Sequence, residues 1–172
     1  MKVFLTGLPG VGKTTIVKKF LKTYSRKVVG FFTPEIRKSG KRIGFEIELI
    51  PSGEKLLFAF VDRISSVRFG KYWISMENLE KAIENVKILT EKEKANLIVI
   101  DEIGKMEMVS PKFREFVEEL VSSPKNLLCV VHRAYAKKFE KYGKVIFVTT
   151  ENRDSLPERL LGCFHPRHCV FF

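Results

Sequence analysis

The sequence predicts an α/β fold, a three-layer sandwich in which helices cover both faces of a mostly parallel sheet with an antiparallel extension. Continuous apolar runs, typical of strands buried on both faces, alternate along the chain with segments of helical periodicity. The 172 residues suffice for one core, and no Pro/Gly/Ser-rich linker or internal repeat divides them. We therefore expect a single domain over residues 1–172, with an antiparallel insert at about 28–61.

The first expected elements are a short strand, a glycine-rich loop and a helix. Residues 2–6 form a mainly apolar run, and residues 14–24 place apolar side chains along one helical face. The loop between them fits the pattern Gly-x-x-x-x-Gly-Lys-[Ser/Thr], which is typical of phosphate-binding loops. The loop residues are Gly7, Leu8, Pro9, Gly10, Val11, Gly12, Lys13, Thr14 and Thr15.

This loop predicts a site for a triphosphate. Glycines let several backbone N–H groups turn toward a phosphate at the N-terminus of a helix, where the helix dipole also favours negative charge. Lys13 is expected to contact the β- and γ-phosphates, and the Thr14 hydroxyl is expected to bind the Mg²⁺ ion that bridges them. The sequence thus predicts nucleoside triphosphates as partners and Mg²⁺ as the cofactor.

The periodicity changes from helical to alternating after residue 28. Apolar and charged residues alternate over residues 42–49, and turn signals flank that segment. Residues 28–61 are therefore expected to form a strand and then an antiparallel meander, either as an edge extension of the sheet or as a flap over the nucleotide. Residues 62–74 show no clean period, and their aromatic and basic side chains predict a loop beside the site.

The rest of the chain continues the alternation of helices and strands. Ser75 and Ser110, the latter followed by a proline, are predicted to cap two helices. Residues 97–100 and 127–131 are apolar throughout and predict buried strands. The other expected elements are helices over 76–90, after Ser110, over 134–142 and from about 156, and strands over 145–148 and 169–172.

Asp101 and Glu102 directly follow the buried strand over residues 97–100. In enzymes with a phosphate-binding loop, a carboxylate at the end of a second strand holds the magnesium shell, so Asp101 is expected to share the metal with Thr14. Glu102 is placed to accept a proton from a water aligned on the γ-phosphate, which a hydrolase needs and a kinase does not. The sequence therefore predicts Glu102 as the catalytic base.

A further positive charge is expected at the transition state, because phosphoryl transfer spreads negative charge over the γ-phosphate oxygens. Lys105 is the preferred donor, since it belongs to the same motif as Asp101 and Glu102. Arg133, just after an expected strand, and Arg37, on the insert, stay open as alternatives.

Four segments together resemble a small nucleoside-triphosphatase family that is named from thermophiles and has a human cancer-related relative. The segments are 7–15, 30–37, 101–107 and 152–157, and the likeness spans nearly the whole chain. The resemblance implies a RecA-like phosphate-loop sandwich and Mg²⁺-dependent hydrolysis of ATP, GTP and other nucleoside triphosphates, with broad base tolerance. Beyond the loop, the nucleotide contacts that we expect are Asp101, Glu102, Ile103, Gly104, Lys105, Asn152 and Arg153.

Asn152 and Arg153 correspond by position to the turn on the base side in that family. The alternative is an Asx turn that caps the next helix, and the sequence leaves both interpretations open.

The composition limits the partners without deciding between all of them. The net charge is +11, but Lys and Arg are interleaved with Glu, so a nucleic-acid partner is possible but not favoured. Two alternative functions stay open: a nucleotide or small-molecule kinase, and a nucleic-acid-linked ATP-binding module. No apolar run is long enough for a membrane span, and three cysteines suit a reducing, cytoplasmic setting. The sequence sets no expectation for the oligomeric state.

Four residues that could bind a metal ion, two Cys and two His, occur close together near the C-terminus. His168 and Cys169 are adjacent, so on an extended chain they would point to opposite faces. We therefore expect a plain C-terminal strand here and no zinc site, although the segment also contains Cys163 and His165.

Overall fold

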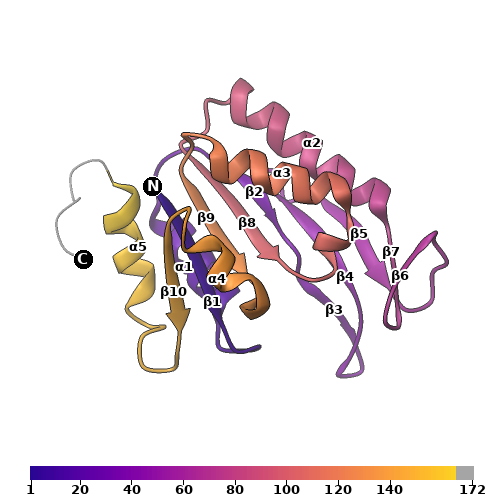
Figure 1. The fold of residues 1–172 in the computed structure, drawn as a ribbon. Helices are drawn as coiled ribbons and strands as arrows, with labels where there is room; N and C mark the ends of the chain where they lie inside the picture. The colour runs from indigo at the N-terminus through magenta and orange to yellow at the C-terminus, as the bar shows by residue number, and fades with distance from the viewer. Residues whose placement is uncertain (166–172) are drawn as a thin grey trace.

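The computed structural model describes residues 1–165, and within them ten strands form one mixed sheet (Figure 1). Their order is β10-β1-β9-β8-β2-β4-β5-β7-β6, and β3 pairs with β4 beside this path. The strands are β1 Lys2–Gly7, β2 Val28–Phe32, β3 Glu35–Lys38, β4 Lys41–Ile50, β5 Lys55–Phe60, β6 Val67–Phe69, β7 Tyr72–Ile74, β8 Leu97–Ile103, β9 Leu127–Val131 and β10 Lys144–Val148. The helices are α1 Lys13–Thr23, α2 Met76–Lys92, α3 Pro111–Ser122, α4 Ala136–Phe139 and α5 Leu156–Phe164, with the 3₁₀ turns η1 Glu107–Val109 and η2 Arg133–Tyr135.

The strands β10, β1, β9, β8 and β2 are parallel neighbours and form one half of the sheet. Strands β8 and β9 are buried along almost their whole length, as their continuous apolar runs predict. The carboxyl ends of the parallel strands point to one edge, at the bottom of Figure 1. Side chains that follow these strands therefore meet at the same edge of the molecule.

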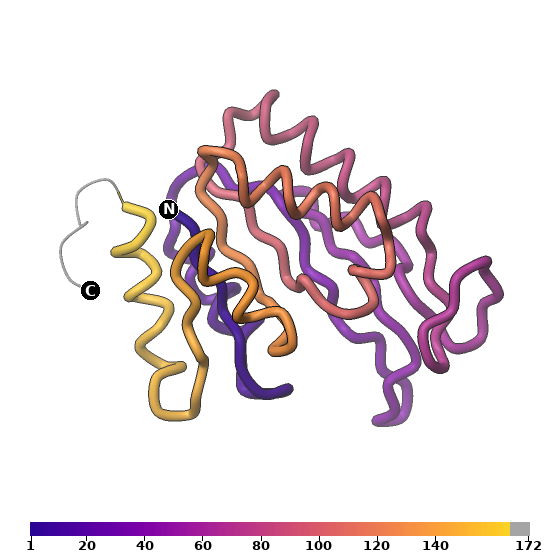
Figure 2. The backbone as a smooth tube through the Cα atoms, in the orientation of Figure 1, coloured from indigo at the N-terminus to yellow at the C-terminus, as the bar shows by residue number. Residues whose placement is uncertain are grey.

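Helices cover both faces of the sheet and give three layers (Figures 1 and 2). On one face, α2, α3 and α4 pack around a core that includes Phe31, Phe58 and Phe113. On the other face, α1 and α5 pack around a core that includes Phe20 and Leu160. The predicted α/β sandwich is confirmed, and its antiparallel extension comprises β4, β5, β7 and β6, with β3 paired to β4.

The antiparallel half consists of β4, β5, β7 and β6, with β3 paired to β4. The expected insert started at residue 28, but β2 pairs in parallel with β8, so the antiparallel part begins only at β3. The loop expected over residues 62–74 is wrong, because the hairpin β6–β7 lies there with Gly70 in its turn at φ 58°. Each of its strands has three residues, which is too short for alternation to be recognised.

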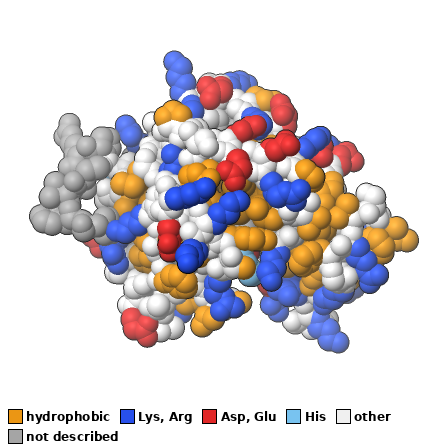
Figure 3. All heavy atoms as spheres, viewed as in Figure 1, with side chains coloured by type: hydrophobic (Ala, Val, Ile, Leu, Met, Phe, Trp, Pro, Cys, Tyr) orange, Lys and Arg blue, Asp and Glu red, His pale blue; other side chains and the backbone are white. Residues whose placement is uncertain are grey.

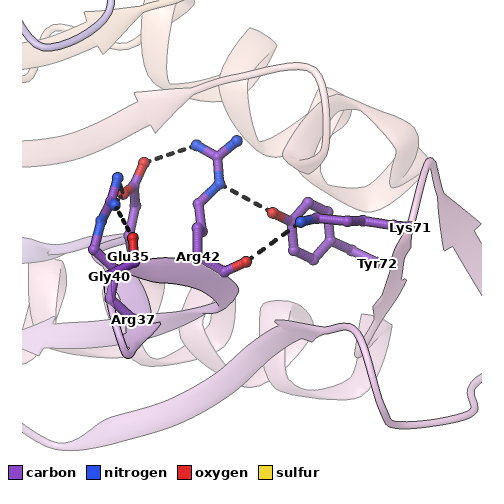
Figure 4. A network of polar contacts seen from close by, with 6 residues as sticks. All are labelled: Glu35, Arg37, Gly40, Arg42, Lys71 and Tyr72. Carbon is purple, nitrogen blue, oxygen red and sulfur yellow. Dashed lines mark hydrogen bonds and ion pairs between the residues drawn. The ribbon is translucent and has the colours of Figure 1, made fainter.

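A polar network ties the β3–β4 hairpin to the β6–β7 hairpin (Figure 4). Arg42 donates to Glu35 Oε1 at 2.8 Å through Nη1 and to the Tyr72 hydroxyl at 3.0 Å through Nε. Lys71 Nζ donates to the Arg42 carbonyl at 3.4 Å, and Arg37 also pairs with Glu35 at 2.7 Å. The meander is thus an extension of the sheet whose first hairpin is held in place, which favours the edge-extension alternative over a free flap.

The remaining elements largely follow the sequence. Ser75 and Ser110 cap α2 and α3, because their Oγ atoms accept the N–H groups of Asn78 and Phe113. The helix expected over 134–142 is shorter than predicted, since η2 comes first and α4 ends at Phe139. Among residues 1–165, no helix is both long and apolar enough to cross a bilayer. The strand expected over 169–172, with His168 and Cys169, lies outside the described residues.

Candidate active site

The phosphate-binding loop lies at the carboxyl end of β1 and leads directly into α1. Gly7 ends the strand, and a Cβ there would lie 2.6 Å from the carbonyl oxygen of Val148 on β10. Gly12 precedes the helix with φ 107°, a conformation that glycine adopts without a steric penalty. These two glycines allow a tight turn from strand to helix at the edge where the parallel strands end.

Lys13 is the first residue of α1, and its ammonium group folds back over the loop. Its Nζ donates to the carbonyl oxygens of Gly7 at 3.1 Å and Leu8 at 2.9 Å. Burial lowers the pKa of Lys13, whereas the nearby carboxylates of Glu102 and Asp101 raise it. The ammonium group is therefore within electrostatic reach of both carboxylates that follow the second buried strand.

Asp101 lies near the carboxyl end of β8 and is only 4% exposed. Burial raises its pKa to about 7, and a hydrogen bond from the Thr14 hydroxyl acts in the opposite direction. Its Oδ2 atom is buried and finds no hydrogen-bond partner within residues 1–165. A buried carboxylate oxygen without a partner is costly, so this atom fits a cation ligand.

The Thr14 hydroxyl and the Asp101 carboxylate together fit Mg²⁺. This ion prefers hard oxygen ligands and is usually bound through one or two protein groups, substrate phosphates and water. Within the described part of the chain, no group of three or more His, Cys, Asp or Glu side chains forms a metal cage. A metal held partly by the substrate matches these two ligands better than a metal enclosed by protein.

Glu102 follows Asp101 on β8 and is half-buried. Burial raises its pKa, and the positive charge of Lys13 lowers it. Its backbone N–H donates to Thr33 Oγ1 at 3.1 Å, in the segment that connects β2 to β3. A carboxylate with a raised pKa is a better proton acceptor than an exposed one, which suits the predicted role as a base.

A third carboxyl group, that of Glu107 on η1, lies beside Glu102, and the sequence assigned it no role. It is 3% exposed, and burial raises its pKa to about 8. Gly104 lies against both side chains, since a Cβ on it would be 2.5 Å from Glu107 Oε2 and 2.7 Å from Glu102 Oε1. Glu107 and Thr33 both belong to segments that carry the family resemblance, which is the signal that would have drawn attention to them.

Lys105 and Arg133 are exposed at the same edge of the sheet. Burial lowers the pKa of His132, and the charges of Lys105 and Arg133 lower it further, so these groups lie close together. The charge of Arg133 also reaches Lys13, whose pKa is lowered mainly by burial. Lys and Arg side chains are visible along this lower edge in Figure 3. The third candidate, Arg37, is instead paired with Glu35 in the β3–β4 hairpin.

Asn152 and Arg153 lie in the turn after β10. The Asn152 side chain accepts from the N–H of Thr149 at 2.9 Å and donates to the carbonyl of Phe147 at 2.8 Å. It therefore closes this turn and does not cap α5, whose N-cap is Ser155. Arg153 is exposed, and the side chain of Phe147 is 58% exposed next to the turn. The exposure of this ring could not be predicted from the sequence, because Phe147 falls within an apolar run.

The family model described as NTPase matches residues 2–161. The chain belongs to this NTPase family. Among its relatives, nucleoside-triphosphatase THEP1 of Methanocaldococcus jannaschii is 42% identical over 94% of this chain and 96% of the relative. THEP1 of Thermotoga petrophila is also 42% identical, over 94% of this chain and 91% of the relative. The family resemblance inferred from the motifs is confirmed.

Two solved structures of NTPases share the fold. The crystal structure of THEP1 from Aquifex aeolicus has a TM-score of 0.81 at 31% identity, and the match covers 96% of this chain and 99% of that one. The solution structure of a human cancer-related nucleoside triphosphatase has a TM-score of 0.76 at 31% identity, over 96% and 98% of the two chains. The likeness extends over nearly the whole length of each protein.

Proposed function

We propose that this NTPase-family member hydrolyses nucleoside triphosphates to diphosphates and phosphate with Mg²⁺ and with little preference for the base. The observation that carries the proposal is the pair of neighbouring carboxylates, Asp101 and Glu102, within electrostatic reach of Lys13 at one edge of the sheet. The names of the relatives, nucleoside-triphosphatases, support the same reaction. Each residue has a separate role in it.

The phosphate loop binds the triphosphate through its backbone amides and Lys13. On binding, the ammonium group exchanges the carbonyl oxygens of Gly7 and Leu8 for oxygens of the β- and γ-phosphates. Burial lowers the pKa of Lys13, and the negative charge of bound phosphates acts in the opposite direction by favouring the protonated ammonium group.

Thr14 and Asp101 hold the metal. When bound, Mg²⁺ neutralises part of the negative charge on the β- and γ-phosphates. The buried Oδ2 of Asp101, without a partner in residues 1–165, supports this role. A cation bound there would favour the ionised carboxylate of Asp101, which opposes the effect of burial on its pKa.

Glu102 accepts a proton from a water molecule aligned on the γ-phosphate. The water oxygen bonds to the γ-phosphorus, the bond to the bridging oxygen breaks, and the diphosphate leaves with that oxygen. The proton stays on Glu102 until it passes to solvent. Lys105 stabilises the charge on the γ-phosphate oxygens from the same edge of the sheet.

The turn after β10 contacts the base without reading its edge. The amide of Asn152 bonds the backbone of Thr149 and Phe147, so the turn sets its orientation and only one N–H and one oxygen lone pair remain. The exposed ring of Phe147 offers a stacking surface, and stacking tolerates every base because each has a π-face. Arg153 is free to contact the sugar or phosphates from the rim.

A nucleic-acid-linked ATPase is the second candidate function. Seven exposed cations on the β3–β4 and β6–β7 hairpins and the chain before β6 favour it, because only two exposed acidic residues, Glu35 and Asp62, accompany them. The cations are Arg37, Lys38, Lys41, Arg42, Arg63, Arg68 and Lys71. Phosphate backbones bind such surfaces with a strong dependence on salt.

Phosphate release from ATP, GTP, CTP and UTP tests the proposal, each measured with Mg²⁺ and with excess EDTA. We expect similar kcat/KM values for all four substrates and loss of turnover in EDTA. Formation of the diphosphate without free phosphate, and only after a nucleoside or other acceptor is added, would identify a kinase. A large stimulation by a single-stranded oligonucleotide would favour the second candidate function.

A further inference from the structure

Thr33 holds the peptide group that joins Asp101 to Glu102. Its N–H and its hydroxyl both donate to the carbonyl oxygen of Asp101, at 2.6 and 3.0 Å. The same hydroxyl oxygen accepts the N–H of Glu102 at 3.1 Å. One side chain from the loop after β2 thus binds both polar atoms of the peptide that connects the metal ligand to the base.

Glu107 limits where the side chain of Glu102 can lie. Its carboxyl group is buried and lies beside the Thr33 hydroxyl. The carboxyl groups of Glu107 and Glu102 both lie against Gly104. The turn that carries it is fixed at both ends: Met108 N–H donates to the Gly104 carbonyl at 3.1 Å, and Ser110 N–H donates to the Glu107 carbonyl at 3.1 Å. The Glu107 carboxyl therefore has little freedom to move away from Glu102.

We propose that Thr33 and Glu107 are positioning residues that fix the backbone and the carboxylate of Glu102 relative to the phosphate loop. The inference rests on the proposed function, because it assigns their effect to Glu102 as the base. Neither residue contacts the nucleotide in this account. Their contribution is geometric, since a general base must lie within hydrogen-bond reach of the proton that it removes, and small misplacements slow such steps strongly.

The first test compares Thr33→Val with Thr33→Ser in the full chain. Valine keeps the shape but removes the hydroxyl, so we expect kcat for ATP to fall roughly 10-fold or more while KM changes little. Serine keeps the hydroxyl and should restore most of the rate. Thr90→Val is the matched control, because Thr90 is buried and its hydroxyl has no hydrogen-bond partner within residues 1–165.

The second test compares Glu107→Met with Glu107→Gln. Methionine keeps the length of the side chain but removes its polar group, and we expect a similar loss in kcat with binding of a non-hydrolysable ATP analogue retained. Glutamine keeps a polar group of the same shape and should retain most of the activity. Thermal melting identifies a variant that does not fold, in which case the Thr33 pair decides alone.

Combination with Glu102→Gln separates positioning from a general loss of structure. If Thr33 acts through the base, Thr33→Val should slow the Glu102→Gln enzyme less than about 2-fold further, because the two changes remove the same contribution. A full additional loss in the double variant would overturn the inference. The inference would also be overturned if Thr33→Val and Glu107→Met both kept the wild-type kcat while Glu102→Gln was slow. If Glu102→Gln itself is as fast as the wild type, the base assignment fails and the inference fails with it.

Discussion

The parallel half of the sheet buries carboxyl groups at its carboxyl edge, whereas the antiparallel half keeps the carboxylates of Glu35 and Glu46 paired with cations near the surface. Asp101 and Glu107 are almost fully buried, and burial raises the pKa of both. Burial would also raise the pKa of Glu35, but hydrogen bonds from Arg42 and Arg37 hold it below its ordinary value. The charged form of a carboxyl group is thus disfavoured by burial in the parallel half and stabilised by arginine side chains in the antiparallel half.

The energetic scales explain what this difference means. An uncompensated buried polar group costs about 1–3 kcal/mol in proteins, whereas an exposed ion pair contributes about 1 kcal/mol or less. Burying carboxyl groups at the parallel edge therefore lowers the stability of the fold. Such a cost is expected at a site where a metal and a substrate bind. The antiparallel half gains only modest stability from its network.

Among the substitutions that test this difference between the two halves of the sheet, Lys105→Ala should have the largest effect. If Lys105 stabilises the charge on the γ-phosphate, its loss should lower kcat roughly 10³-fold while ATP binding persists. Lys71→Ala, in the antiparallel half, is the matched control and should leave kcat unchanged. Specific activity should also be independent of protein concentration.

Two results would move this role elsewhere. A near-normal rate for Lys105→Ala together with a slow Arg133→Ala would transfer the role to Arg133. Specific activity that climbs with protein concentration would indicate a cation supplied by a second subunit.

Gly104→Ala should produce the next largest effect. The added Cβ would lie within 2.7 Å of carboxylate oxygens of both Glu102 and Glu107, so the half-buried Glu102 side chain must shift from its position. We therefore expect a small change in melting temperature but a loss of roughly 10- to 100-fold in kcat. Gly162→Ala is the control, since within residues 1–165 no neighbouring atom lies within 4 Å of its Cβ position in α5, and it should be neutral or slightly stabilising. Equal activity in both variants would show that the position of Glu102 does not limit the rate.

The pH dependence of stability should reveal the buried carboxyl of Glu107. Its pKa rises from 4.5 to about 8 on folding, so between these values the folded chain holds a proton that the unfolded chain has lost. Stability from this group is therefore complete at low pH and declines as the pH rises through this range. Asp101 acts in the same direction, so the measured quantity is the difference between the wild type and Glu107→Gln. Melting temperatures should fall less with rising pH in the variant, and parallel curves would refute the assignment.

Arg42→Ala should have the smallest effect. Its side chain is 44% exposed, so loss of its contacts to Glu35 and Tyr72 should cost about 1 kcal/mol or less, or a shift of about 2–4 °C in melting temperature. Hydrolysis should be unchanged if the network is scaffold. A marked change in KM for ATP would instead mean that the β3–β4 hairpin contacts the nucleotide.

The parts of this contrast that depend on local sequence were predictable. The phosphate loop is defined by consecutive residues, and the caps Ser75 and Ser110 act on N–H groups three residues away. Asp101 and Glu102 follow a run that is apolar throughout, so their place at the end of a buried strand could be read directly.

The parts that depend on long-range contacts were not predictable. Thr33 contacts Glu102 although the two residues are 69 positions apart in the sequence. Glu107 comes to lie beside Glu102 through the turn η1 that follows β8. The pairing of β2 with β8 is likewise invisible in either segment alone. Phe147 belongs to an apolar run, so only the structure reveals that its ring is exposed.

The central claim is that the buried edge of the parallel half is a hydrolytic site with Glu102 as its base. It is tested most directly by Glu102→Gln, which keeps the shape of the side chain but removes the proton acceptor. Single-turnover hydrolysis of ATP and binding of an ATP analogue are measured on the same preparation, with Lys13→Ala for comparison. We expect Glu102→Gln to hydrolyse ATP roughly 10²-fold or more slowly while binding the analogue normally, whereas Lys13→Ala loses binding itself. Hydrolysis by Glu102→Gln at the wild-type rate would contradict the account.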